Sequence, residues 1–233
     1  MALAREQPVI LIIENVLDAE DLGFVDETLA KARFRDGAAS AGGTAALRKR
    51  NLELDRAATP GAEALETLLV RALAAKRDFN DNVLPSRFAR PIVNRYEPGM
   101  EYGVHVDNPL MGGAGGMLRT DVSVTIFLSD PASYDGGELT IGEEGHERAV
   151  KLARGSAVAY TTGTPHRVAP VTRGARLAGI LWAQSVVADP GRRAILADLQ
   201  RAHHLLAEKS PEAPETALLL QGYYNLLRLW AEP

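Results

Sequence analysis

A histidine and an aspartate stand two positions apart in the segment YGVHVDNPLM, which covers residues 102–111. Because side chains alternate along a strand, we expect His105 and Asp107 to project from the same face. Such a strand would present an imidazole and a carboxylate side by side, and both are common metal ligands. A surface ion pair or a packed core histidine would use the same two residues, so the pair alone does not select a metal site.

A third ligand would have to come from another strand, and His166 begins such a segment directly after Pro165. Two imidazoles and one carboxylate make up the facial triad, which leaves three adjacent positions of an octahedral Fe(II) open for substrate and oxygen. The other histidines fit this pattern less well. His146 lies in the charged turn GEEGHE, and His203 and His204 are neighbours on a predicted helix, about 100° apart around its axis. We interpret these three as solvated or packing residues.

The segments that must position the triad become short and rich in β-forming residues from Pro91 onward. Eight strand-like segments follow one another in about ninety residues, which is the density of a double-sheet jelly roll. We therefore predict an α+β fold that is mainly β, with a double-stranded β-helix of the cupin-like type over about residues 91–186.

Helical patterns flank this core on both sides. Before it we predict a strand at residues 9–13 and two helices, one capped by Asp18 and one opened by Pro60. After it, residues 192–209 and 216–232 carry apolar residues at helical spacing and predict a carboxy-terminal helical hairpin. These patterns predict one domain over residues 1–188 and a helical appendage over residues 189–233.

The composition limits the classes of protein to which the chain can belong. With 26 Lys and Arg against 30 Asp and Glu, the net charge is −4 and no basic tract stands out, so nucleic acid is not an expected partner. The absence of cysteine excludes disulfides, thiolate metal sites and cysteine nucleophiles, and suits a reducing compartment. The apolar run near the first residue is too short for a signal peptide or a membrane span. We expect a cytoplasmic location and no membrane partner.

Three longer segments add a family resemblance to this pattern: NRYEPGMEYGVHVDNPLM, SVTIFLSDPASYDGGEL and HRVAPVTRGARLAGILWAQS. In this order they resemble the Fe(II)/2-oxoglutarate-dependent dioxygenases of the prolyl 4-hydroxylase-like superfamily, and most closely the bacterial PKHD-type hydroxylases associated with iron uptake. The resemblance implies that His105, Asp107 and His166 bind iron and that no further side chain is catalytic. It also implies oxidative decarboxylation of 2-oxoglutarate to succinate and CO2, coupled to hydroxylation of a substrate, and stimulation by L-ascorbate.

The segment after His166 predicts where the cosubstrate is held. If TRG is a three-residue hairpin loop with Gly174 in the left-handed conformation, Arg176 points to the same interior as His166, whereas a two-residue loop would turn it outward. An inward arginine is costly unless an anion meets it, and the distal carboxylate of 2-oxoglutarate is such an anion. The resemblance assigns the same role to Arg176. Arg173 better suits a surface position.

Two aromatic residues and one loop are further candidates near this site. Trp182 is expected on the same face as Arg176, where it would either wall the cosubstrate pocket or pack in the core. Tyr96 resembles the family position whose hydroxyl can help to hold the cosubstrate, and a packed strand tyrosine is the alternative. The glycine-rich loop at residues 108–120 is interpreted as a lid or as a flexible linker.

Several alternatives stay open for the function. A non-catalytic sensor of iron or 2-oxoglutarate would use the same residues, a zinc or manganese cupin would need another ligand set, and a structural barrel would leave polar groups inward without partners. For the substrate, a small molecule or siderophore-like metabolite is favoured over a prolyl or lysyl peptide, because no extended peptide-binding feature is visible. The carboxy-terminal helices are predicted to support a homo-oligomer.

Overall fold

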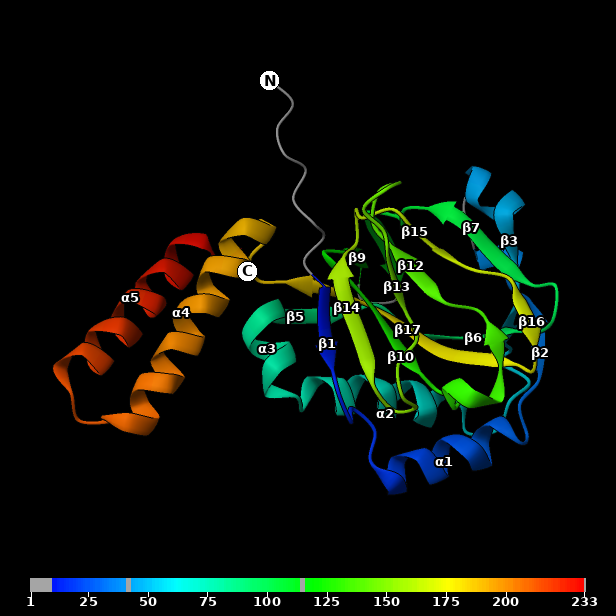
Figure 1. Ribbon diagram of the computed structural model, residues 1–233, viewed down its shortest axis with the longest axis horizontal. Coiled ribbons are helices and arrows are strands. Elements are labelled where there is room, and N and C mark those ends of the chain that lie inside the picture. Colours follow the sequence, from blue (N-terminus) through cyan, green and yellow to red (C-terminus); the bar gives the residue numbers. More distant parts are fainter. Residues whose placement is uncertain (1–9, 41–42, 114–115, 233) are drawn as a thin grey trace.

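The strand-rich centre of the chain forms two facing antiparallel sheets in the computed structural model, which describes residues 10–40, 43–113 and 116–232 (Figure 1). The larger sheet contains, in order of neighbours, β1 (Ile10–Ile13), β14 (Ala157–Thr161), β10 (Val122–Phe127), β17 (Arg176–Ser185), β6 (Ile92–Tyr96), β4 (Leu52–Leu54) and β2 (Phe34–Asp36), with β5 (Pro85–Phe88) also paired to β17. The smaller sheet contains β13 (Arg148–Val150), β12 (Leu139–Ile141), β15 (His166–Val168), β7 (Glu101–His105) and β3 (Lys49–Arg50). The predicted jelly roll is confirmed.

Two short ribbons complete the β structure. One pairs β8 (Leu110–Gly113) with β9 (Gly116–Arg119), and the other pairs β11 (Asp135–Gly136) with β16 (Val171–Arg173). All eight predicted segments from residue 91 onward contain strands, although the segment that begins at His166 is broken into β15 and β16. The predicted strand at residues 9–13 corresponds to β1, and Val9 lies outside the described residues.

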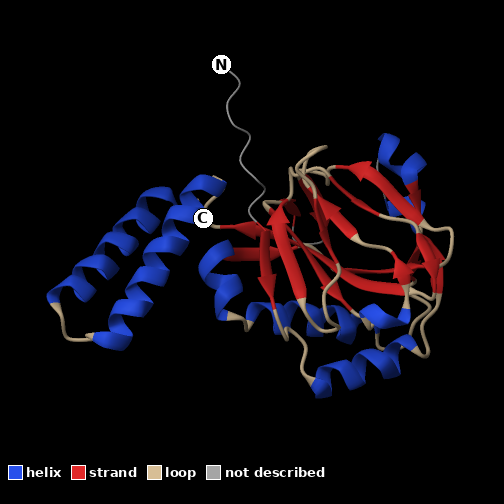
Figure 2. Ribbon diagram, viewed as in Figure 1, coloured by secondary structure: helices blue, strands red, loops and turns tan. Residues whose placement is uncertain are grey.

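Helices cover one face of the larger sheet, as Figure 2 shows. They are α1 (Ala19–Leu29), α2 (Ala62–Ala74) and α3 (Arg77–Val83). The apolar stripe of α2, which includes Leu65 and Leu69, is fully buried with Val124 and Leu181 of the sheet in one core. Gly179 permits this contact, because a Cβ there would lie 2.9 Å from Leu69 Cδ1. The opposite face of the sheet meets the smaller sheet around a second core that includes Tyr96, Phe127 and Tyr160.

The amino-terminal third confirms some of its predicted features and corrects others. Asp18 caps α1 through a hydrogen bond from the Asp21 backbone N–H at 2.9 Å, as predicted. Pro60 does not open the second helix, because Gly61 is its N-cap and α2 begins at Ala62. The strands β2 to β4, the helix α3 and the 3-10 helices η1 (Gly37–Ser40) and η2 (Gly43–Arg48) were not predicted, since segments this short carry no period of their own. A third 3-10 helix, η3 (Pro131–Ser133), follows β10.

The last two helices, α4 (Pro190–Lys209) and α5 (Pro214–Trp230), form the predicted hairpin, which extends away from the sheets in Figure 1. Leu196 and Tyr223 are buried between these helices together with Val187 from the segment after β17. α4 lies against α3, where His204 Nδ1 is 3.5 Å from Asp81 Oδ2. Five large apolar side chains of the hairpin remain exposed: Ile195, Leu205, Leu218, Tyr224 and Leu229. None of the described helices combines the length and the apolar character needed to cross a bilayer.

Candidate metal and cosubstrate site

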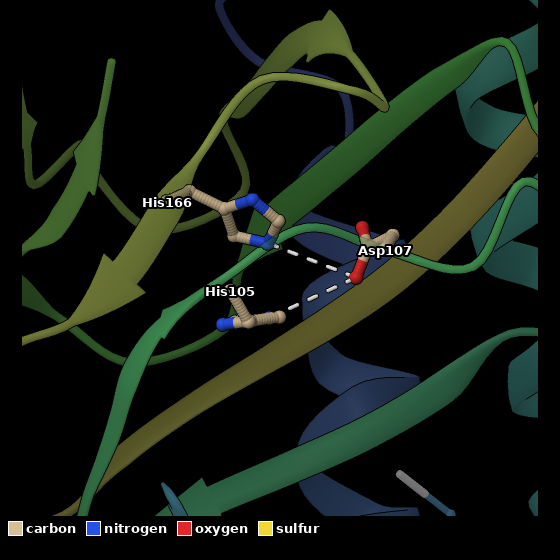
Figure 3. A group of neighbouring side chains, drawn as sticks. All are labelled: His105, Asp107 and His166. Carbon is tan, nitrogen blue, oxygen red and sulfur yellow. Dashed lines mark ion pairs between the residues drawn. The ribbon is translucent and has the colours of Figure 1, made fainter. Parts of the chain in front are cut away.

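The predicted triad comes together at one end of the smaller sheet (Figure 3). His105 is the last residue of β7 and is directly paired with His166, the first residue of β15. Asp107 Oδ1 lies 3.8 Å from His105 Nε2 and 3.7 Å from His166 Nε2. Among the described residues, this is the one group of three such side chains whose donor atoms lie close enough to hold a metal, all within 4.8 Å of one another. The alternation of side chains predicted that Asp107 would lie on the same strand as His105. Asp107 instead lies beyond the end of β7, which stops at His105, two residues earlier than predicted.

Backbone carbonyls fix the orientation of both imidazole rings. His105 Nδ1 lies 2.8 Å from the Gly103 carbonyl oxygen, and His166 Nδ1 lies 3.0 Å from the Thr164 carbonyl oxygen. A carbonyl only accepts, so each Nδ1 must carry a proton, and the neutral form of each ring has its lone pair on Nε2. Both lone pairs are on the side of Asp107. The two rings therefore have the tautomer that a metal ligand requires.

Burial, and after it the neighbouring His166, lowers the pKa of His105 to about 4. The neutral form is the one that binds a metal ion. The Tyr102 ring stacks on the His105 ring with the centroids 3.5 Å apart, and this contact further restricts the orientation of the imidazole. Two imidazoles and one carboxylate suit a divalent first-row metal such as Fe(II), so the donor set fits the iron that the sequence predicted.

A cavity of about 860 Å³ opens beside the triad and extends to Arg176. The Arg176 side chain is 1% exposed, and its three guanidinium nitrogens have no hydrogen-bond partner among the described residues. The rings of Tyr96 and Phe127 lie beside it, with centroids 5.4 and 5.6 Å from the guanidinium carbon, and the buried hydroxyl of Tyr134 is close enough to interact with its charge. A buried cation with every donor free is suited to a carboxylate at the inner end of the cavity. The arrangement therefore fits a dicarboxylate held between the triad and Arg176.

The hairpin register from which the inward direction of Arg176 was predicted is wrong. β16 pairs with β11 and not with β17, and no ladder joins β16 to β17 in the described part of the chain. The cause is a change of sheet: β15 ends at Val168, Pro170 has no N–H with which to continue it, and the chain crosses to the larger sheet through Gly174. Gly174 has a φ of +71°, as predicted. Arg176 nevertheless faces the cavity, because it pairs with Tyr96 on β6 with both side chains inward.

The two aromatic candidates line the same cavity. Tyr96 is 1% exposed, and burial raises the pKa of its hydroxyl above the ordinary range, so it stays protonated beside Arg176. Trp182 is 7% exposed, and its Nε1–H donates to Asp107 Oδ2 at 2.9 Å. This contact with the triad was not predicted, since Trp182 had been expected only as a pocket wall or as a core residue.

Sequence patterns also did not single out an ion pair that lines the cavity. Lys49 Nζ lies 2.5 Å from Glu53 Oε1, with both side chains at most 6% exposed, and it also donates to Ser40 Oγ at 2.7 Å. Lys49 Nζ lies 5.5 Å from the centroid of Tyr102, the ring that stacks on His105. Two charges four positions apart in RKRNLELD give no sign of burial, because such a spacing is common on exposed surfaces.

The predicted loop at residues 108–120 is largely the ribbon of β8 and β9, with residues 114–115 outside the described part. Leu110, Met111 and Leu118 of this ribbon line the cavity. Its movement as a lid stays a prediction.

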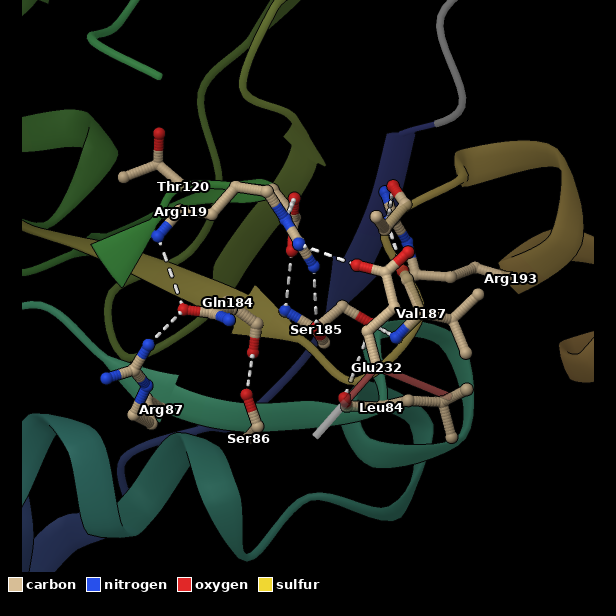
Figure 4. A network of polar contacts seen from close by, with 12 residues as sticks. Leu84, Ser86, Arg87, Arg119, Thr120, Gln184, Ser185, Val187, Arg193 and Glu232 are labelled. Carbon is tan, nitrogen blue, oxygen red and sulfur yellow. Dashed lines mark hydrogen bonds and ion pairs between the residues drawn. The ribbon is translucent and has the colours of Figure 1, made fainter. Parts of the chain in front are cut away.

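Polar contacts attach the ribbon at its base, as Figure 4 shows. Arg119, at the end of β9, donates to Asp121 Oδ1 and to Glu232 Oε2, each at 2.8 Å. Gln184 Oε1 accepts from the Arg119 backbone N–H at 3.2 Å and from Arg87 Nη2 at 2.7 Å. The ribbon beside the cavity is thus connected both to β17 and to Glu232, two residues beyond the end of α5.

Comparison with known proteins gives matches over most of the chain. The family model described as 2OG-Fe(II) oxygenase superfamily matches residues 91–184, and the model described as PKHD-type hydroxylase C-terminal domain matches residues 191–232. A relative from Synechococcus elongatus, named PKHD-type hydroxylase, is 42% identical over 224 residues, which are 96% of this chain and 100% of the relative.

Solved structures with the same fold are more distant in sequence. A Pseudomonas putida prolyl-4-hydroxylase is 19% identical, with a TM-score of 0.52 over 76% of this chain and 93% of its own. HygX from Streptomyces hygroscopicus, with nickel and 2-oxoglutarate bound, is 17% identical, with a TM-score of 0.50 over 79% of this chain and 88% of its own.

Proposed function

The chain belongs to the PKHD-type hydroxylases, which are Fe(II)- and 2-oxoglutarate-dependent dioxygenases, and on this premise we propose that His105, Asp107 and His166 hold its iron. The predicted family, the enzyme class and the use of Fe(II) and 2-oxoglutarate are confirmed by this membership, and ascorbate is typical for the family. The observation that carries the assignment of the ligands is the convergence of two oriented Nε2 atoms on one oxygen of Asp107.

Arg176 is proposed to bind the distal carboxylate of 2-oxoglutarate, while Tyr96 and Trp182 flank the cosubstrate. The support is the set of three buried guanidinium nitrogens of Arg176, which lines the cavity and has no hydrogen-bond partner among the described residues. When bound, the iron supplies the oxygen activation that couples decarboxylation of 2-oxoglutarate, to succinate and CO2, with hydroxylation of a C–H bond. The chain itself orients the ligands, neutralises the carboxylate and excludes water.

The experiment that tests this proposal is anaerobic loading with Fe(II) and 2-oxoglutarate, followed by exposure to air and measurement of succinate. We expect succinate to form with the wild-type protein and to be lost when Arg176 is replaced by Met. A protein that binds iron and 2-oxoglutarate but never forms succinate, with or without a metabolite extract, would contradict the proposed roles.

The substrate is proposed to be a small anionic molecule, such as a siderophore-like metabolite connected with iron uptake. A cavity of about 860 Å³ is within the usual size range of small-molecule sites. Arg87 and Arg90 are among its lining residues, and Arg90 Nε lies 4.0 Å from Glu66 Oε1. Arg87 donates only to neutral oxygens in the described contacts, those of Gln184 and Met117, so its charge is available to an anion.

This choice is tested by mass spectrometry of a metabolite extract that has been separated into anionic and neutral fractions and incubated with the loaded enzyme. A gain of one oxygen is expected on a compound of the anionic fraction, and the gain should weaken with Arg87→Gln. A gain on a neutral compound, or on a prolyl or lysyl residue of a peptide, would replace the proposal with that substrate class.

We further propose that residues 189–233 are an appendage to a dioxygenase domain over residues 1–188, that they join two copies of the chain, and that the protein acts in the cytoplasm. The support for the association is the set of exposed apolar side chains on the hairpin, among them Leu218 and Leu229 at 63% and 75% exposure. Exposed leucines in such number on a pair of helices are favourable to burial against a second copy.

A further inference from the structure

The two oxygens of Asp107 have different surroundings. Oδ1 faces the two imidazoles, at 3.8 and 3.7 Å from their Nε2 atoms. Oδ2 accepts two hydrogen bonds, from Ser123 Oγ at 2.8 Å and from Trp182 Nε1 at 2.9 Å. One oxygen is therefore left for a metal ion, while the other is held by protein donors.

The two donors come from a single pair of residues in the larger sheet. Ser123 on β10 is the register partner of Trp182 on β17, so their side chains lie beside each other on the same face. Both are buried, at 1% and 7% exposure. Asp107 lies outside regular structure, and these donors therefore connect a ligand in a loop to two central strands of the sheet.

A second hydroxyl, that of Thr162, lies beside Ser123 and bears on which group donates. Ser123 Oγ lies 3.1 Å from Thr162 Oγ1 as well as 2.8 Å from Asp107 Oδ2. A serine has one hydroxyl hydrogen, and an ionised carboxylate can only accept. Ser123 must then donate to Asp107, and Thr162 donates to Ser123. All hydrogen bonds in this series are therefore donated toward Asp107 Oδ2, from Thr162 to Ser123 and from Ser123 to the carboxylate.

We propose that Ser123 and Trp182 are positioning residues that keep Asp107 a ligand through Oδ1 alone, an inference that rests on the proposed iron site. A carboxylate without these donors could rotate and bind a metal through both oxygens, which would occupy a position that the cosubstrate needs. Both donors act on the same oxygen, whereas packing alone gives no reason for such asymmetry. Loss of a hydrogen-bond donor to a metal ligand typically weakens metal affinity by about 10–100-fold.

The test compares Ser123→Ala and Trp182→Phe, which each remove one donor, with Ser123→Thr, which keeps the hydroxyl. Anaerobic titration with Fe(II) in the presence of 2-oxoglutarate gives the dissociation constant, and the visible absorption of the Fe(II)–2-oxoglutarate complex reports the coordination of the metal. We expect about tenfold weaker iron binding for each donor-deleting variant. We also expect a shifted absorption band for these two variants, with Ser123→Thr close to wild type in both measurements.

Trp230→Phe is the matched control, because Trp230 lies on α5 and Trp182 is the other of the two tryptophans. This variant should bind iron like the wild type, and its emission, which then comes from Trp182 alone, should change on iron binding. The change should disappear with Asp107→Asn. Thermal unfolding of each variant shows whether the protein is folded. If Trp182→Phe does not fold, the comparison of Ser123→Ala with Ser123→Thr tests the positioning role.

The possible outcomes separate this inference from the proposed function. If the wild type binds iron, and folded Ser123→Ala and Trp182→Phe show the same iron affinity and absorption as the wild type, the positioning role is overturned. The proposed iron site is then unaffected. A wild-type protein that binds no Fe(II) would overturn the proposed function, and the positioning role with it.

Discussion

Replacing Arg176 by Met is expected to stabilise the protein without cosubstrate while removing its response to 2-oxoglutarate. Arg176 is 1% exposed, and none of its three guanidinium nitrogens has a hydrogen-bond partner among the described residues. Met has a similar length, no charge and a flexible side chain that can fill the same space. The substitution therefore removes an unpaired buried charge and leaves most of the packing in place.

The size of the effect follows from two opposing contributions. An unpaired buried ion costs several kcal/mol relative to water, even after the surroundings relax. The rings of Tyr96 and Phe127, at 5.4 and 5.6 Å, return about 1–2 kcal/mol each through cation–π contact. A net gain of about 2 kcal/mol for Arg176→Met corresponds to a rise in Tm of roughly 4–8 °C in a chain of this size.

The assay is thermal unfolding with Fe(II), with and without 2-oxoglutarate at about a hundred times its Kd. The wild type should gain about 2.7 kcal/mol of stability from the cosubstrate, and Arg176→Met should gain none. Arg173→Met is the control, because Arg173 is 59% exposed and pairs with Asp135 at 2.7 Å, so it should change neither Tm nor the response by much. A cosubstrate-free Arg176→Met protein with a lower Tm than wild type, or one that 2-oxoglutarate still stabilises, would refute the reasoning.

Three further predictions concern the triad, the buried ion pair and the hairpin. His166→Ala should abolish Fe(II) binding and succinate formation in a protein that remains folded by circular dichroism, and retained iron affinity would argue against His166 as a ligand. Lys49→Met should lower the free energy of unfolding in urea by about 3–5 kcal/mol, because it leaves Glu53 buried without its partner, while adding Glu53→Leu should restore most of it. Equal losses in the single and double variants would contradict the role of the unpaired charge. Light scattering should give a dimer mass for the full chain and a monomer mass for Leu218→Glu combined with Leu229→Glu, and a monomeric wild type would exclude the proposed interface.

The core strands were predictable because their patterns are local. β10 is buried along its whole length and contains the uninterrupted β-forming run VSVTIF, so its position does not depend on its neighbours. β3 has only two residues and exists through its pairing with β7, which no local pattern specifies. The strand that contains His105 was predicted two residues too long for the same reason. The end of β7 is set by where its pairing with β15 stops, and no local pattern specifies that point.

Arg176 shows how a correct direction can follow from an incorrect pairing. Its inward position was predicted from a hairpin between β16 and β17, yet it is set by the pairing of β17 with β6, where Arg176 lies opposite Tyr96. A side chain in a strand can point only to one of the two faces of the sheet. A wrong pairing therefore still gives the correct face when its register differs from the true one by an even number of residues. The chemical requirement is more general than the register: an inward arginine needs an anion whichever strand carries it.

The donors to Asp107 Oδ2 could be predicted only in part. In VSVTIF, Ser123 and Thr125 share one face of a strand that is otherwise apolar, and a buried hydroxyl requires a hydrogen-bond partner. The sequence therefore indicates polar contacts on the inner face of β10. It does not indicate that Ser123 lies opposite Trp182, because that register is set by the whole sheet. A polar residue on the buried face of a strand that neighbours a metal site is consequently a candidate to orient a ligand, and only the pairing identifies which ligand.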